Sequence, residues 1–585
     1  MNPTAHPPTE RATAPLRTGR GADLLVEALV RSGVTHLFGV PGDTGVVFYD
    51  ALAASTDRIT HVLARDERHA AAMADAYARA ANEVGVVEVS SGGGTTYVVG
   101  GLGEAFASGT PVLLVTSDIH RGSRGTGALT EIDQRALFSA VTKRVIVVDS
   151  AAEIPAAVRD ALDTATSGRP GPVAVVVPED VLDEEVDVDD NAFGGSVGLP
   201  RTRPVADRDL LARAADALAA AERPALLVGA GVHVSQAYDE VELLAEHLGA
   251  GVATTIHGKG TIADSNRWAL GVTGNNGGGP VAAGCLADAD VVLVVGSRAN
   301  ATDTDSFTAP GRGATVIALD IDPSIICRNY PDAIPLAGDA RTVLQQLRAA
   351  VPERDTVQVA SRHDRIRLRR DAQVRSPAPD APAGKLLVDD VVDAVAAVLD
   401  GLDPIVVADP GAPTPATADR FPVTRAGRGF VVPRGHGPMG FALPAAVGVA
   451  VAYPDRPVLA LTADGSFAMS CGELETIARL ELPVIGIQFT NHSLGWIKML
   501  QHLYQDERYF GVDPGPIDAV AVARACGLRA HRPTTIEEVR EQVTSALRDR
   551  VAVYLDVEVP HMIDVVPQVP AWHRALNGDR VRPVY

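Results

Sequence analysis

Residues 458–467 read VLALTADGSF and residues 484–495 read VIGIQFTNHSLG, and these two stretches decide the fold of the C-terminal part of the chain. In each, an apolar, strand-like run ends in a polar loop, and a helix-like segment, Gly472–Leu480, lies between them. This order of strand, loop, helix, strand and loop predicts a parallel sheet. Both loops then lie at the carboxyl edge of the sheet, where open α/β folds bind ligands.

The two loops carry hard oxygen ligands, Asp464 and Asn491, which are 27 residues apart (491 − 464 = 27). A carboxylate, an amide oxygen and a backbone carbonyl suit Mg²⁺, which keeps part of its coordination shell for phosphate. Gly465 and Ser466 allow backbone amides to approach a phosphate closely. Because an Asp-Gly pair after a strand is usually only a turn, the second loop and the spacing are what predict a diphosphate–metal site.

The composition, with 46% hydrophobic and 21% charged residues, is typical of a globular protein that can bury an ample core. Its 585 residues predict about three to five domains. The net charge of −21 argues against a nucleic-acid partner, which needs clustered Lys and Arg. Four scattered cysteines without a Cys-x-x-Cys pair favour a reducing compartment and argue against a zinc site.

No segment of the sequence predicts export or membrane insertion. Residues 1–20 are rich in Pro, Thr, Ala and Arg and lack the apolar core of a secretory signal, so we expect a disordered tail. No apolar run reaches about 18 residues free of charge, so we expect no membrane span. These observations together predict a cytoplasmic protein.

Strand-like runs alternate with helical stretches, which predicts three α/β units with doubly wound parallel sheets. We place the units at residues 21–190, 205–351 and 384–570, with a C-terminal tail at 571–585. The acidic run 179–190 and the Gly/Pro-rich stretch 193–204 are interpreted as a linker. The expected strands in the first two units include His36–Val40, Gly85–Ser90, Val112–Thr116, Val173–Val177, Ala225–Gly229, Val291–Gly296 and Val316–Asp320.

The pair of ligand loops resembles the metal-binding motif of thiamine-diphosphate enzymes, which begins Gly-Asp-Gly and ends Asn-Asn. Two positions depart from that motif, because Ala463 replaces its first Gly and Thr490 its first Asn. The resemblance implies that Asp464, Asn491 and the backbone carbonyl of Ser493 bind Mg²⁺, and that thiamine diphosphate is the cofactor.

Residues 64–79 read ARDERHAAAMADAYAR, an Ala-rich run that predicts a helix with Glu67 in its first turn. Taken alone, Glu67 would be a helix-start carboxylate. In enzymes similar to acetolactate synthase, however, a segment like this one carries the Glu that touches the aminopyrimidine ring of the cofactor. The residue before it is usually His, and here it is Asp66. The resemblance implies that Glu67 is the catalytic residue, which favours the imino tautomer that removes the C2 proton.

Two further segments resemble cofactor-binding motifs of the family. Residues 434–446, RGHGPMGFALPAA, contain Met439 at the position that wedges between the two cofactor rings. Without its neighbours this segment is equally well a Gly-rich loop with a core Met. In the Asp-Pro-Gly run at 409–411, the Gly matches the residue whose carbonyl receives the 4′-amino group. The resemblance implies that the cofactor-binding residues are Gly411, Met439, Gly465, Ser466, Gly495 and Trp496.

The expected substrate pocket departs from that of acetolactate synthases proper. Thr130 stands where the family places an active-site Gln, and Leu500 where true members place a Trp that recognises the second 2-oxo acid. The resemblance implies a pocket shaped by Thr130, Ile497 and Leu500, together with Trp496, which could equally be a packed core aromatic. These differences favour an acceptor other than the usual one.

The middle unit carries Gly-rich pieces at 229–231 and 296–298 and an acidic piece at 320–323, each after a strand-like run. None of them completes a Gly-x-Gly-x-x-Gly fingerprint. Acetolactate synthases hold FAD in this region, and other relatives hold ADP or nothing. We therefore expect a structural middle unit and keep FAD as the alternative.

The resemblance extends over about residues 21–570. It implies a homodimer or homotetramer with active sites at the subunit interface. The implied reaction is decarboxylation of a 2-oxo acid, with pyruvate favoured, followed by carboligation of the resulting carbanion to a carbonyl acceptor. Two alternatives stay open: a simple 2-oxo acid decarboxylase that releases an aldehyde, and a non-catalytic cofactor-binding homologue.

Overall fold

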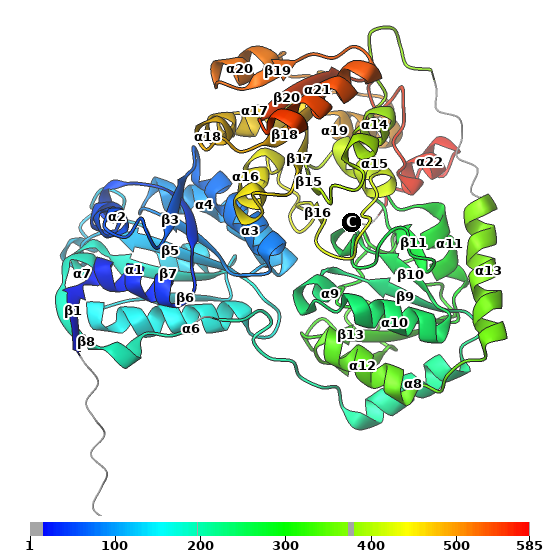
Figure 1. Cartoon of the computed structure of the whole chain (residues 1–585), viewed down its shortest axis with the longest axis horizontal. Coiled ribbons are helices and arrows are strands. Elements are labelled where there is room, and N and C mark those ends of the chain that lie inside the picture. The colour runs from blue at the N-terminus through cyan, green and yellow to red at the C-terminus, as the bar shows by residue number, and fades with distance from the viewer. Residues whose placement is uncertain (1–15, 196, 373–379, 584–585) are drawn as a thin grey trace, which may run out of the picture.

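The computed structural model describes residues 16–195, 197–372 and 380–583. In these ranges the chain forms three six-stranded sheets, flanked by helices, in which every strand pairing is parallel (Figure 1). The predicted class, three parallel-sheet α/β units, is confirmed. The described helices include none with the length and apolar character that a membrane crossing requires.

The first sheet has the strand order β3-β2-β4-β5-β7-β6. Its strands are β2 (His36–Val40), β3 (Thr60–Leu63), β4 (Gly85–Val89), β5 (Val112–Asp118), β6 (Arg144–Val147) and β7 (Val173–Pro178). Its helices are α1 (Gly21–Arg31), α2 (Val46–Ala53), α3 (Glu67–Ala81), α4 (Gly93–Ser108), α5 (Gln134–Phe138), α6 (Ile154–Thr166) and α7 (Glu179–Asp183).

The second sheet has the strand order β11-β10-β9-β12-β13-β14. Its strands are β9 (Pro224–Val228), β10 (Gly251–Thr254), β11 (Ala269–Val272), β12 (Val291–Val295), β13 (Thr315–Asp320) and β14 (Ile334–Ala337). Its helices are α8 (Arg208–Ala220), α9 (Ala230–Ser235), α10 (Tyr238–Leu248), α11 (Pro280–Asp288), α12 (Ala340–Ala350) and α13 (Thr356–Ala372).

The third sheet has the strand order β16-β15-β17-β18-β20-β19. Its strands are β15 (Ile405–Ala408), β16 (Phe430–Val431), β17 (Val458–Ala463), β18 (Val484–Thr490), β19 (Arg529–His531) and β20 (Val553–Glu558). Its helices are α14 (Val388–Leu399), α15 (Pro413–Arg420), α16 (Ala442–Ala452), α17 (Asp464–Ser470), α18 (Glu473–Arg479), α19 (Gly495–Tyr504), α20 (Ala519–Ala525), α21 (Ile536–Asp549) and α22 (Pro570–Leu576).

The apolar runs become central strands because parallel sheets are covered on both faces. All five residues of β12 are buried, and so are all seven of β18. The predicted strands before the two ligand loops are confirmed as β17 and β18, which pair in register from Val458 with Val484 to Ala463 with Phe489. This pairing brings the ends of the two strands, and therefore both loops, to the same edge.

The first and third units pack together through α3 and α16, which lie side by side in Figure 1. Both helices are rich in Ala, so their backbones approach closely. A Cβ on Gly448 of α16 would lie 2.1 Å from the backbone oxygen of Met73. At the edge of this contact, the buried Arg79 pairs with Asp75 and donates to the Val432 carbonyl.

Two sequence interpretations near the N-terminal unit are corrected by long-range pairing. Leu16–Arg20 is a strand, β1, rather than tail, because it pairs antiparallel with β8 (Glu185–Asp189). The acidic run predicted as linker instead forms α7 and β8. The expectation of disorder for residues 1–15 lies outside the described residues.

Candidate active site

The two ligand loops meet at Asp464. This residue is the first of α17 rather than part of a loop, because the chain turns into a helix directly after β17. Its Oδ1 accepts from the Gly465 amide at 3.0 Å, and its Oδ2 accepts from the His492 amide at 2.6 Å. Burial raises the pKa of Asp464, while these backbone hydrogen bonds lower it. A bound cation would therefore stabilise its charged form.

Asn491 and Ser493 lie in the second loop, and both are buried. The Ser493 amide donates to Asn491 Oδ1 at 3.1 Å, which fixes the shape of this loop. A Cβ on Gly495 would lie 2.8 Å from Asn491 Nδ2, so only Gly fits there without a shift. In the described part of the chain no group of three or more His, Cys, Asp or Glu side chains could hold a metal. The expected set of one carboxylate, one amide oxygen and one carbonyl does not need such a group.

The start of α17 also fits a phosphate. The Ser466 side chain is fully buried, and its hydroxyl has no hydrogen-bond partner among the described residues. A buried hydroxyl without a partner is costly, and a ligand oxygen would satisfy it. The neighbouring Gly465 allows two side chains to pack closely against it, since a Cβ there would lie 2.8 Å from Leu494 Cδ2 and 3.0 Å from Met439 Cε.

Met439 therefore lies against Gly465 at the start of α17. Its side chain is 36% exposed, so it is not a packed core Met. The following Gly440 has φ +80° and packs on α17, where its Cβ would lie 3.0 Å from Met469 Cβ.

Asp409 joins three of these segments, a role that its place in the Asp-Pro-Gly run did not reveal. It is fully buried at the end of β15. Its Oδ1 accepts from the Phe441 and Ala442 amides at 2.7 and 3.1 Å, and its Oδ2 accepts from Thr462 Oγ1 at 2.7 Å. Burial raises the pKa of Asp409 to about 6. Asp409 thus holds the start of α16 and the end of β17, which leads into α17, next to Gly411, which has φ +108°.

Glu67 begins α3, as predicted. Asp66 is the N-cap residue, and its side chain accepts from the Arg68 amide at 2.8 Å. Glu67 is half-buried, and a Cβ on Gly94 would lie 3.3 Å from its Oε1, so the start of α4 lies against the carboxylate. The lack of a side chain at Gly94, the second residue of α4, therefore allows this close approach.

The segment around Glu67 is tied to the third unit by Glu473, another residue that the motifs did not indicate. Glu473 is fully buried at the start of α18. Its Oε1 accepts from the Arg65 amide at 3.0 Å and lies 2.9 Å from His69 Nδ1, while its Oε2 accepts from Thr476 Oγ1 at 2.7 Å. A carboxylate on α18 thereby positions the N-terminus of α3.

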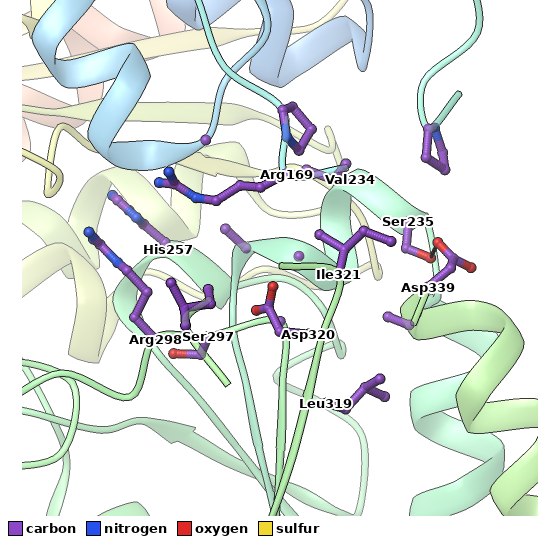
Figure 2. Close-up of a pocket in the computed structure, with 18 of the residues that line it drawn as sticks. Arg169, Val234, Ser235, His257, Ser297, Arg298, Leu319, Asp320, Ile321 and Asp339 are labelled. Atoms are coloured by element: carbon purple, nitrogen blue, oxygen red, sulfur yellow. Dashed lines mark hydrogen bonds between the residues drawn. The ribbon is translucent and has the colours of Figure 1, made fainter. Parts of the chain in front are cut away.

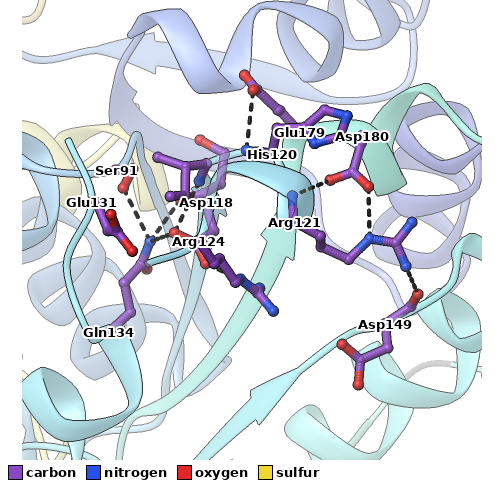
Figure 3. Close-up of polar contacts among 12 residues, drawn as sticks. Ser91, Asp118, His120, Arg121, Arg124, Glu131, Gln134, Asp149, Glu179 and Asp180 are labelled. Carbon is purple, nitrogen blue, oxygen red and sulfur yellow. Dashed lines mark hydrogen bonds and ion pairs between the residues drawn. The ribbon is translucent and has the colours of Figure 1, made fainter. Parts of the chain in front are cut away.

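Thr130 lies against the same loop as Glu67. It has φ +67°, and a Cβ on Gly92 would lie 2.7 Å from its Cβ. Its carbonyl accepts from Ser91 Oγ at 2.8 Å. Four residues further on, Gln134 is buried, but it is held by β5, where it donates to the Ser117 carbonyl and to Asp118 (Figure 3).

The remaining predicted pocket residues lie on α19. Trp496 packs on Trp572 of α22, with ring centroids 4.3 Å apart, and Leu500 joins the same apolar cluster. Ile497 is 47% exposed. The C-terminal residues that were expected to form a tail therefore include a helix that covers α19. Trp496 contacts this helix, Leu500 packs against the same cluster, and Ala412, a member of the cluster, is the neighbour of Gly411 in the chain.

The middle unit contains a pocket at the carboxyl ends of β9, β12 and β13 (Figure 2). The Gly-rich pieces pack closely, since a Cβ on Gly231 would lie 2.6 Å from Gly296 Cα. Arg169 enters from the first unit, and Arg298 and Asp320 line the pocket from the second. Burial raises the pKa of Asp320 to about 6.

Comparison with family models identifies the class of protein that this fold and these loops define. The thiamine pyrophosphate enzyme N-terminal TPP binding domain matches residues 19–137, the central domain matches 211–347, and the C-terminal TPP binding domain matches 409–557. The chain is a thiamine-diphosphate enzyme. These matches support thiamine diphosphate as its cofactor.

Similar proteins narrow the class further. A probable acetolactate synthase large subunit of Methanocaldococcus jannaschii is 33% identical over 95% of both chains. The acetolactate synthase isozyme 3 large subunit of Escherichia coli is 31% identical over 94% of this chain and 96% of its own. The acetolactate synthase large subunit of Corynebacterium glutamicum is 32% identical over 96% of this chain and 90% of its own. The chain belongs to the acetolactate synthase-like family of thiamine-diphosphate enzymes.

Proposed function

We propose that this enzyme uses thiamine diphosphate and Mg²⁺ to decarboxylate a 2-oxo acid, with pyruvate as the favoured donor, and joins the two-carbon unit to a carbonyl acceptor. The observation that carries this proposal is the union of the two ligand loops by the hydrogen bond from the His492 amide to Asp464. The names of the relatives, which are acetolactate synthases, favour carboligation over release of an aldehyde.

The metal would be held by Asp464, Asn491 and the Ser493 carbonyl, with Gly465 and Ser466 at the diphosphate. In support, Asp464 is held by backbone amides rather than by a cation, and the buried Ser466 hydroxyl has no partner among the described residues. A divalent ion would supply the positive charge that a buried carboxylate and a diphosphate both need.

At the other end of the cofactor, Glu67 would hold a proton at the aminopyrimidine ring. Met439 would fix the bent shape of the cofactor, and the Gly411 carbonyl would accept from its amino group. Gly495 and Trp496, at the start of α19, would complete the wall of the site. When bound, thiamine diphosphate supplies the carbanion chemistry, while the protein supplies orientation and a dry site.

The acceptor is proposed to differ from that of acetolactate synthases proper, because Thr130 and Leu500 stand at positions that differ from the family pattern. The close packing of Thr130 against Gly92, together with the contact between Gly94 and Glu67, supports a place for Thr130 beside the reacting centre. Ile497, exposed on α19, would contact the incoming carbonyl compound.

Active sites at the interface of a homodimer or homotetramer are also proposed, since the motifs for the two ends of the cofactor lie on separate sheets. The sequence favours a structural middle unit, but the residues that line its pocket would fit an adenine nucleotide, either FAD or ADP. Arg169 and Arg298 suit its phosphates, and Asp320 suits a ribose hydroxyl. The absorbance spectrum of the purified protein and chromatography of any released nucleotide test this assignment. A yellow protein indicates FAD, and a nucleotide-free protein contradicts the assignment of an adenine nucleotide to this pocket.

The test of the proposed reaction is incubation with pyruvate, thiamine diphosphate and Mg²⁺ while CO₂, aldehyde and acyloin are followed. A panel of aldehydes and 2-oxo acids serves as acceptors. CO₂ with an acyloin product supports the proposal, and CO₂ with free aldehyde supports a simple decarboxylase. Absence of turnover with a panel of 2-oxo acid donors would overturn both.

A further inference from the structure

A buried carboxyl group that the proposed reaction does not use lies in the sheet next to Glu67. Glu88 is the fourth residue of β4, and only 1% of its surface is exposed. No cation pairs with it in the described part of the chain, and its Oε1 has no hydrogen-bond partner there. An ionised carboxylate in such a place would have a large desolvation cost that no cation offsets. The surroundings therefore favour the neutral acid.

One oxygen of Glu88 is fixed by a short chain of polar groups. Tyr49 Oη of α2 donates to Glu88 Oε2 at 2.5 Å, and the same Oη lies 3.1 Å from His61 Nε2 of β3. Gly39 makes room for this arrangement, because a Cβ there would lie 3.0 Å from Oε2 and 3.2 Å from Tyr49 Oη. The fold thus provides both a hydrogen-bond donor and the space that this carboxyl group needs.

The other oxygen faces a second polar group across Gly45. A Cβ on Gly45 would lie 3.2 Å from Glu88 Oε1 and 3.5 Å from Ser117 Oγ. Ser117 in turn shares a hydrogen bond of 2.8 Å with Thr44, whose Oγ1 accepts from the Ser91 amide. This network leads to the loop that contacts both Thr130 and Glu67.

The titratable groups around Glu88 fit the same assignment. Burial raises the pKa of Glu88 to about 8, the Tyr49 hydrogen bond lowers it, and the charge of Glu67 on α3 raises it further. Burial lowers the pKa of His61 to about 4, and so does the nearby Arg479 of α18. Burial and the Glu88 carboxylate raise the pKa of Tyr49, which therefore stays protonated.

We propose that Glu88 is a positioning residue for Glu67. Tyr49, which also contacts His61, holds Glu88 as a neutral acid, so that Glu88 adds no second negative charge beside the Glu67 carboxylate. The proposal rests on the proposed role of Glu67. If Glu88 ionises, its charge disfavours the ionised form of Glu67 and disturbs the proton that Glu67 shares with the cofactor. Cofactor activation should therefore fall on the alkaline side.

The first test measures stability, so that it does not depend on turnover. The pKa of Glu88 is near 4.5 when unfolded and about 8 in the folded protein. The stability that it contributes is present at low pH and is lost as the pH rises through this window. We expect the free energy of unfolding of Glu88→Gln, relative to wild type, to rise between pH 5 and 8 with the slope of about one proton. A difference that stays constant across this window would overturn the proposal.

The second test measures exchange of the C2 proton of bound thiamine diphosphate as a function of pH, without a 2-oxo acid. We expect an alkaline fall near pH 8 in wild type that is absent from Glu88→Gln. If that variant does not fold, Tyr49→Phe serves instead. Loss of its hydrogen bond raises the pKa of Glu88, so the alkaline fall should move to higher pH. An unchanged midpoint would contradict the proposal, whereas failure of the proposed reaction alone would leave this exchange intact.

Discussion

At the scale of single residues, the carboxylates of the site are held by neutral donors. Asp464 and Asp409 each accept hydrogen bonds from two backbone amides, and neither forms an ion pair in the described part of the chain. Backbone hydrogen bonds hold such carboxylates in place without an ion pair to a nearby Arg or Lys. Asp464 is thus free of a competing cation and would bind the proposed metal ion, and Asp409 orders the segments around it.

Replacement of Asp464 by Ala should weaken Mg²⁺-dependent retention of thiamine diphosphate by at least about tenfold, or about 1.4 kcal/mol. The reason is that the variant loses the one charged ligand of the proposed metal set. Titration of cofactor into protein with and without Mg²⁺ measures this effect. Asp455→Ala, an exposed carboxylate in the same unit, is the control. Equal affinity in the two variants would refute the ligand assignment.

Replacement of Glu67 by Gln should leave cofactor binding intact and reduce turnover by about 10²- to 10⁴-fold. The amide keeps the shape of the side chain but cannot share a proton with the ring. Steady-state rates with saturating cofactor measure the loss. Glu83→Gln, an exposed residue just after the same helix, is the control. Turnover near that of the control would exclude a catalytic role for Glu67.

Asp409→Ala should lower the free energy of unfolding by about 3 kcal/mol or more, because it leaves three buried donors unpaired at about 1–3 kcal/mol each. It should also weaken cofactor binding, since the segment that follows Met439 and the end of β17, which precedes Asp464, lose their common acceptor. Asp409→Asn keeps an acceptor for the two amides and should lose less of both. Chemical denaturation and cofactor titration compare the variants. Equal losses in Ala and Asn would show that the hydrogen bonds are unimportant.

At the scale of elements, the packing of α3 on α16 sets the relation of the first and third units. Small residues bring the two helices close enough that Gly448 lies against the backbone of Met73. The same contact places the N-terminus of α3, with Glu67, next to α18 and its buried Glu473. A substitution inside this helix pair should therefore also shift the N-terminus of α3 and Glu67.

Gly448→Val should reduce the free energy of unfolding by about 1–3 kcal/mol or more, because its Cβ would collide with the Met73 carbonyl and push the helices apart. Thermal and chemical unfolding measure the change. Gly515→Ala is the control, since a Cβ there meets nothing within 4 Å. Similar stability of the two variants would mean that the close approach is not required.

The sequence predicted the elements with a local signal and missed those without one. Apolar runs such as Val484–Phe489 identified the central strands, because full burial leaves no alternation to obscure them. The pairing of Leu16 with Asp189 joins residues far apart in the chain, and no local sequence pattern predicts it. The helical start at Asp464 was missed because Asp-Gly is also a turn signal.

The candidate site residues also divide into those with a local sequence signal and those without one. Motifs predicted Glu67, Met439, Asp464 and Asn491 as site residues because cofactor chemistry limits which residue types can serve. The residues that tie these segments together, such as Asp409 and Glu473, carry no motif of their own. Their roles depend on which loops the fold brings within hydrogen-bond reach.

At the scale of the whole molecule, the proposed reaction requires two units of the fold to bind one cofactor. Glu67 and Asp464 are 397 residues apart (464 − 67 = 397) and lie at different sheets. The proposed homodimer would place Glu67 of one subunit opposite Asp464 of the other. Light scattering on the purified protein should therefore give at least twice the chain mass of 60.9 kDa. A monomer with full activity would contradict the proposed interface.

A cofactor site shared between two subunits is tested most directly by complementation between two inactive variants. Glu67→Gln and Asp464→Ala are co-expressed with different tags, and dimers that carry both tags are purified. Each mixed dimer has one site with both wild-type residues, so the population should recover roughly half of the wild-type activity per dimer. Mixed dimers that stay as inactive as the two parent variants would contradict a thiamine-diphosphate site shared between Glu67 and Asp464 of different subunits.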